Sequence, residues 1–178
     1  MSRERVIDYP RQSVLSPQKR EILERVAIGQ TNAEIARAFG NALATVVSHL
    51  RGENNSIQHR LGARRQGQAI LKAFEMGELD LITIVEKCNF DFDRYKKLMP
   101  REIQVLDKLT NPSRRMGNKD IADVMHIGRD AVRLSLYSIG KKLGVSKREE
   151  MIVFHLAATT YPFEKSVRYN GVVEESGF

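Results

Sequence analysis

An internal repeat divides most of the chain into two similar parts. One segment, LSPQKREILERVAIG, begins at Leu15, and a second, LMPREIQVLDKLTN, begins at Leu98, about 83 residues later. In each, an aliphatic pair, Ile22-Leu23 or Val105-Leu106, follows the first leucine by seven and eight positions, after a proline that suits the start of a helix. The repeat therefore predicts two small units of the same fold.

Both copies continue with the same series of short amphipathic segments. NAEIARAF at 32–39 and NKDIADVM at 118–125 each predict a helix whose asparagine is the N-cap or its neighbour. ATVVSHL and AVRLSLY start a third helix, IQHRLGA and IGKKLGV follow, and GQAILKAFEMG and REEMIVFHLAA predict a fourth. Four helices in about 60 residues, with a tight turn between the second and third, indicate a helix-turn-helix unit.

The segment between the copies is too apolar and aromatic for a flexible linker. We expect Ile82, Val85 and Phe90 to pack, and DLITIVEKC to form a short helix. The sequence therefore predicts an all-α chain with a structured helical linker. Its predicted parts are a first four-helix domain at 15–79, the linker at 80–97, a second four-helix domain at 98–158 and a C-terminal tail at 159–178.

Each copy resembles the C-terminal DNA-binding module of LuxR/FixJ-type (GerE-like) transcription regulators. The second copy carries PREIQVL, NKDIA and KKLGVSKR, and the first carries EIL, NAEIA, TVVSH and RLGA, in the order of the family pattern. The resemblance implies tandem LuxR-type helix-turn-helix domains in a sequence-specific transcription regulator that reads the major groove of double-stranded DNA. About 14 residues precede the first copy, so we expect no sensor domain.

Both copies depart from the family pattern. Gln18-Lys19 stands where the first copy should open with Arg-Glu, and Gln66 replaces a later arginine. In the second copy Ala131 replaces a threonine and Ser135 a histidine. These losses in the second copy fall on phosphate-contacting and framework positions, and we expect it to be the weaker DNA reader.

Composition agrees with a nucleic-acid partner. The formal charge is +7 and the pI is about 9.7, which favours a polyanion. The sequence has neither a secretory signal nor a run of about 18 apolar residues, so we expect a soluble, cytoplasmic chain without membrane contact.

The sequence contains no pattern typical of catalysis, and we expect no enzyme activity, cofactor or metal. Cys88 is the single cysteine, which excludes an internal disulfide and a CxxC site. The four histidines lack metal-ligand spacing; they are His49, His59, His126 and His155.

The first copy has four more residues than the family pattern between TVVSH and IQHRLGA. At about 100° per residue, Leu50, Ile57 and Leu61 fall within roughly 60° of Val46, so four extra residues preserve one apolar stripe. This phase favours a recognition helix lengthened by about one turn. The alternative is a break or loop at the poor helix formers Gly52, Asn54 and Asn55.

The face opposite this stripe is the predicted DNA-reading edge of the first copy. The resemblance implies base contacts two, three and six positions after the motif threonine, at Val47, Ser48 and Arg51. Arginine can pair with guanine, asparagine and glutamine with adenine, and valine can touch a thymine methyl. The other DNA contacts that we expect in this copy are Thr45, Asn55, Gln58, Arg64 and Arg65.

The corresponding face of the second copy is mixed. Arg133, Tyr137 and Lys141 suit DNA, whereas Asp130 repels phosphate and Leu134 is apolar without a core partner. Leu134 therefore suggests a protein-binding surface as an alternative. Additional phosphate contacts are predicted at Lys119 and the pair Arg114-Arg115. The core stripe of this helix is predicted to be Val132, Leu136, Ile139 and Leu143.

The fourth helix of the second copy is apolar almost all round, with Val153 and Phe154 in its centre. Single-module relatives commonly pair through this helix. We therefore expect a homodimer through Val153 and Phe154, with internal pairing of the two copies as the alternative. A rival to DNA regulation is an adaptor or anti-activator that binds RNA polymerase or another regulator.

Overall fold

The computed structural model describes residues 13–111 and 117–160 of the chain. Every regular element within these two ranges is a helix, as predicted for an all-α chain. The pair Arg114-Arg115, and the predicted tail from Tyr161 onward, lie outside the described residues.

The first copy contains five helices, of which the second begins with a reciprocal cap. Glu34 N donates to Thr31 Oγ1 at 3.2 Å, and Thr31 N donates to the Glu34 carboxylate at 2.6 Å. The N-cap is therefore Thr31, with Asn32 directly after it, because a hydroxyl can satisfy a free amide of the first turn. The helices are α1 Pro17–Ala27, α2 Asn32–Ala38, α3 Leu43–Arg51, α4 Ile57–Arg60 and α5 Gln66–Glu75.

The prediction of a lengthened recognition helix is wrong. Helix α3 ends at Arg51, a loop follows, and α4 starts only at Ile57. Asn54 and Asn55 both have positive φ, 38° and 80°, a conformation that a helix cannot contain and that asparagine tolerates better than most residues. Burial of the four residues of the predicted stripe is confirmed, although they lie on or beside two separate helices and not on one: Val46, Leu50, Ile57 and Leu61.

The linker is structured, as predicted. It forms α6, Leu81–Cys88, and a short 3-10 helix, η1, Phe92–Lys97. Asp80 caps α6 by accepting from Thr83 N at 2.8 Å. Val85 and Phe90 pack against the core, but Ile82 is 43% exposed, and the buried residue of α6 is Ile84.

The described residues of the second copy form four helices, and the recognition helix among them, α9, is continuous. They are α7 Pro100–Leu109, α8 Asn118–Met125, α9 Arg129–Leu143 and α10 Arg148–Thr160. Helix α9 ends at Gly144, whose φ of 75° is accessible to glycine at little cost. Of its predicted stripe, Val132, Ile139 and Leu143 are buried and Leu136 is partly buried.

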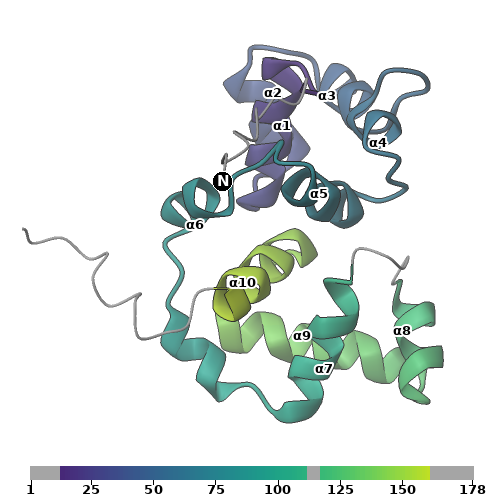
Figure 1. Cartoon of the computed structure of the whole chain (residues 1–178), viewed down its shortest axis with the longest axis vertical. Helices are drawn as coiled ribbons and strands as arrows, with labels where there is room; N and C mark the ends of the chain where they lie inside the picture. Colours follow the sequence, from purple (N-terminus) through teal and green to yellow (C-terminus); the bar gives the residue numbers. More distant parts are fainter. Residues whose placement is uncertain (1–12, 112–116, 161–178) are drawn as a thin grey trace, which may run out of the picture.

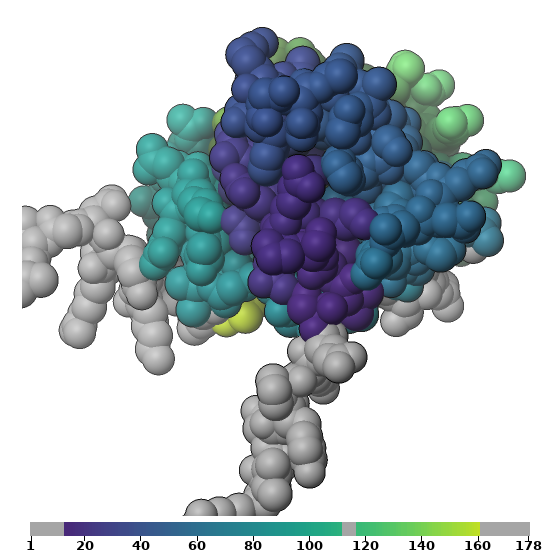
Figure 2. All heavy atoms as spheres, turned by 90° about the horizontal axis from the view of Figure 1, so that it is seen from above, coloured from purple at the N-terminus to yellow at the C-terminus, as the bar shows by residue number. Residues whose placement is uncertain are grey.

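Helix α10 lies at the boundary between the two copies (Figure 1). It packs against α5, α6 and α1 on one side and against α7 and α9 on the other. From above, the first copy, in purple and blue, forms much of the near face, and green parts of the second copy are visible behind it (Figure 2). The two copies therefore share one continuous core.

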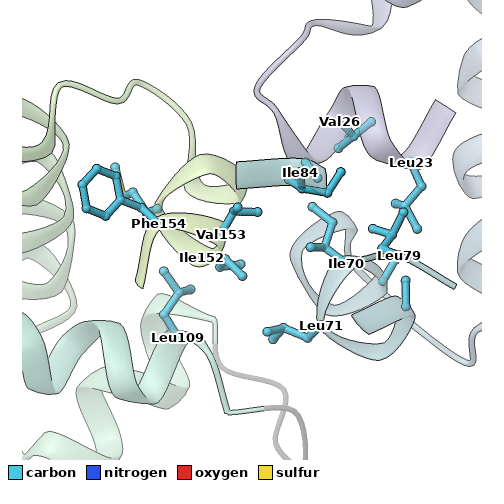
Figure 3. Close-up of a cluster of buried hydrophobic side chains, with 14 of the residues drawn as sticks. Leu23, Val26, Ile70, Leu71, Leu79, Ile84, Leu109, Ile152, Val153 and Phe154 are labelled. Carbon is cyan, nitrogen blue, oxygen red and sulfur yellow. The ribbon is translucent and has the colours of Figure 1, made fainter. Parts of the chain in front are cut away.

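The expected partner-binding role of Val153 and Phe154 is wrong, because both side chains are 0% exposed within one chain. In the close-up Val153 lies near Ile84 and Ile152, whereas the Phe154 ring points to the other side of α10 (Figure 3). The ring of Phe154 packs against Phe90 and Phe92 of the linker. The apolar excess of α10 is covered by the linker and by α5, the last helix of the first copy. A homodimer through this face of α10 would require the shared core to open, so the arrangement observed is internal pairing of α5 with α10.

Candidate nucleic-acid interface

Helix α3 separates its core residues cleanly from its outward residues. Val46 and Leu50 are 0% and 1% exposed. On the other side Ser48 and Arg51 are exposed and Val47 is half-buried; Thr45, near the start of the helix, is exposed. The core contact of α3 therefore holds these predicted base-reading residues at the surface on one rigid element.

The loop after α3 removes Asn55 and Gln58 from this helical face. The main-chain oxygen of Asn55 accepts from Lys19 Nζ at 2.5 Å, and its side-chain oxygen accepts from Arg60 Nε. Gln58 lies half-buried on α4. Ser56 Oγ accepts from His59 N at 3.2 Å and so caps α4. Reading by one extended helix edge from Val47 to Gln58 is thus excluded in this conformation.

A buried carboxylate holds the recognition helix of the second copy. Glu102 is 6% exposed and accepts from Ser138 Oγ and Lys142 Nζ, each at 2.7 Å. Burial raises the pKa of Glu102, but hydrogen bonds from Lys142, Met99 N and Ser138 outweigh it and hold the pKa below its usual value. This pairing fixes α9 against α7.

The equivalent position in the first copy is Lys19, since both residues stand two places after the helix-starting proline. Lys19 is 8% exposed, and its ammonium group donates to the loop carbonyl of Asn55. Burial, and then the neighbouring Arg60, lower the pKa of Lys19. The departure from the family's Arg-Glu opening therefore accompanies the inserted loop, which supplies the lysine with an acceptor.

The outward face of α9 is partly engaged by its own side chains. Arg133 pairs with Asp130 at 3.4 Å, and Lys141 lies 5.0 Å from the centre of the Tyr137 ring. Leu134 and Tyr137 are 64% and 62% exposed. This face therefore presents two large apolar groups beside its cations, and differs in character from the polar face of α3.

The remaining predicted phosphate contacts lie in two places. Arg64 and Arg65 are exposed and line a hollow between the copies together with Arg51 and Gln58. Lys119 is exposed in the first turn of α8. Arg148, at the start of α10, lines the same hollow; it matches the late arginine of the family pattern, but sequence reasoning did not select it.

Within the described ranges, no helix combines the length and the apolar character that crossing a membrane requires.

Comparison with known proteins identifies the family. Residues 13–73 and 96–155 each match GerE, the family described as bacterial regulatory proteins, luxR family. No curated protein and no solved structure matches the chain. With both matches covering most of an all-helical chain, the protein belongs to the luxR family of bacterial regulatory proteins and carries two of its helix-turn-helix domains in tandem.

Proposed function

We propose that this protein is a sequence-specific DNA-binding transcription regulator whose first copy is the main reader of base sequence. The observation that carries the proposal is the orientation of α3. Its inner side is buried through Val46 and Leu50, and its outer side presents Ser48 and Arg51 to solvent. A helix held in this way can enter the major groove with its polar side chains toward the base edges.

The chemistry of this face supports the proposal. Arg51 can donate two hydrogen bonds to guanine, Ser48 can contact several bases, and the half-buried Val47 can touch a thymine methyl. The net charge of +7 favours approach to the phosphate backbone. A bacterial regulator acting on chromosomal DNA works in the cytoplasm, which is the location that we propose.

A second role is supported for the second copy. Leu134 and Tyr137 are both exposed and lie three positions apart on α9. Residues at this spacing are neighbours on a helix surface. Arg133 is already paired with Asp130. An exposed apolar pair on a recognition helix favours a protein partner, such as RNA polymerase or another regulator, over a base edge.

The experiment is a selection of bound sites from a random DNA pool, followed by gel-shift titrations at several salt concentrations. A DNA regulator yields a defined site, bound about 10³-fold or more tightly than random duplex, with affinity that falls steeply as salt rises. Weak binding without sequence preference would contradict this function and favour the adaptor role. Leu134→Ser tests the adaptor role, because it should weaken the binding of a protein partner while leaving the affinity for DNA unchanged.

A further inference from the structure

A hollow of about 330 Å³ lies where the two copies meet. Its floor is apolar and is made by Leu71 of α5, Leu109 of α7 and Ile152 of α10, which lie near one another in the close-up (Figure 3). Its walls carry four arginines, three from the first copy and one from the second: Arg51, Arg64, Arg65 and Arg148. The carboxylate of Glu149 is the acidic group among its lining residues.

Arg65 reaches from the first copy onto the second. Its guanidinium group lies so close to Gly117 that a Cβ there would stand 2.2 Å from Nη1, which means that the group packs directly on the glycine backbone at the start of α8. Arg148 Nη1 donates to Asn118 Oδ1 at 2.7 Å, in the first turn of the same helix. Burial, and then Arg65, lower the pKa of Arg148, and the carboxylates of Glu149 and Asp120 oppose this shift. Arg65 and Arg148 are therefore electrostatic neighbours, with these two acidic groups beside Arg148.

Two features leave this hollow short of negative charge. Within residues 13–111 and 117–160, no ion pair joins Arg51, Arg64 or Arg65 to a carboxylate. The first turn of α5, Gln66 to Gln68, also lines the hollow, has no acidic residue and has no side-chain cap. The positive end of that helix dipole therefore adds to the arginine charges.

We propose that this hollow is a phosphate-binding site formed jointly by the two copies. Guanidinium groups and free helix amides are the donors that proteins use for phosphate oxygens, and several of them converge here with little compensating charge. Because Arg65 and Arg148 come from different copies, the site depends on the tandem arrangement. The phosphate belongs either to the backbone of bound DNA, since Arg51 ends the recognition helix at the rim, or to a free phosphorylated small molecule.

The first arm of the test uses inorganic pyrophosphate and the full chain, with binding measured by calorimetry at low salt. Arg65→Gln removes one cation of the hollow, and Arg64→Gln is a second variant. Arg101→Gln is the matched control, because Arg101 is exposed at the opposite end of α7 from Leu109. We expect both hollow variants to weaken pyrophosphate binding about tenfold or more, and the control to bind as the wild type does.

The second arm measures duplex DNA binding against salt concentration, and only this arm depends on the proposed function. Loss of a backbone contact should reduce the salt slope by about 0.9 in Arg65→Gln and leave base preference unchanged. If Arg65→Gln changes only the affinity for pyrophosphate, the ligand is a free phosphorylated molecule. If it changes only the salt dependence of DNA binding, the ligand is the DNA backbone.

The proposal is overturned if both hollow variants fold normally and match Arg101→Gln in the two assays. In that case selective DNA binding by the wild type would still support the proposed function. Conversely, a chain that binds pyrophosphate through Arg65 but shows no sequence preference on DNA would contradict the proposed function and leave the phosphate site in place.

Discussion

Lys19 Nζ donates a hydrogen bond to the main-chain oxygen of Asn55 at 2.5 Å, across 36 positions of sequence. This contact joins α1 to the loop that separates α3 from α4. In the second copy the equivalent residue is Glu102, which binds Ser138 and Lys142 of an unbroken α9. The same position thus carries opposite charge in the two copies. Glu102 contacts the recognition helix itself, and Lys19 contacts the loop that follows it.

Replacing Lys19 with methionine should destabilise the chain by about 1–3 kcal/mol, because the Asn55 carbonyl loses its charged donor. The free energy of unfolding from urea titration measures the effect. Gln18→Met is the control, since Gln18 is exposed one residue earlier and should change stability by no more than about 0.5 kcal/mol. Equal stability of the two variants would show that the lysine does not hold the loop.

Glu102 should make stability sensitive to acid. Its pKa in the folded chain lies below the ordinary value of 4.5, so its contribution is complete above that pH and is lost as the pH falls through the folded value. We expect the free energy of unfolding to fall as the pH drops below about 4.5, and to fall less in Glu102→Gln. Part of this pH dependence should remain in Glu102→Gln, because other carboxylates of the chain are also paired. A variant slope as steep as that of the wild type would contradict this role.

His155 should make stability depend on pH in a less acidic range than Glu102 does. It is 2% exposed, with Nδ1 at 2.7 Å from Tyr95 Oη and Nε2 at 3.0 Å from Asp107 Oδ1. Burial lowers its pKa below 6.5, although Asp107 opposes the shift, so stability is complete above pH 6.5 and declines as the unfolded chain takes up the proton below it. Thermal unfolding between about pH 7.5 and about pH 5.5 should show this decline in the wild type. A similar decline in His155→Gln would assign it to another group.

Phe154 packs α10 against the linker. Its ring is 0% exposed and lies 4.5 Å from the ring of Phe90 and 5.1 Å from that of Phe92, measured between centroids. Phe154→Ala should cost about 3–5 kcal/mol of unfolding free energy, because it leaves a cavity between α10 and the linker. Tyr137→Ala, at an exposed ring, serves as the control. A loss below about 1 kcal/mol for Phe154→Ala would contradict this packing of α10 on the linker.

The repeat and its apolar periodicity predicted most of the fold. Val46, Leu50, Ile57 and Leu61 recur in helical phase, and burial of all four follows from that phase. The same phase could not distinguish a continuous helix from a loop, because it indicates which residues face the core and not whether the backbone between Leu50 and Ile57 is helical. Asn54 and Asn55 form the loop with positive φ, and their low helix propensity is the feature of the sequence that indicates it.

The position of α10 could not be read from one helix alone. Its all-round apolar surface showed that Val153 and Phe154 need a cover, but a second chain and the linker satisfy that need equally well. Likewise, the sequence selected Arg64 and Arg65 as phosphate contacts without the information that Arg65 would lie on Gly117 of the other copy. Such contacts depend on how the copies pack, which no local pattern encodes.

Base reading by the outer face of α3 depends on Arg51, the exposed arginine at the end of this helix. The measurement is the binding free energy of wild type and Arg51→Ala on the selected duplex and on its single-base variants, at one salt concentration. We predict that Arg51→Ala costs about 1–3 kcal/mol on the selected site and removes discrimination at one base pair. An equal loss on every duplex would make Arg51 a phosphate contact, and no loss on any duplex would contradict reading by α3.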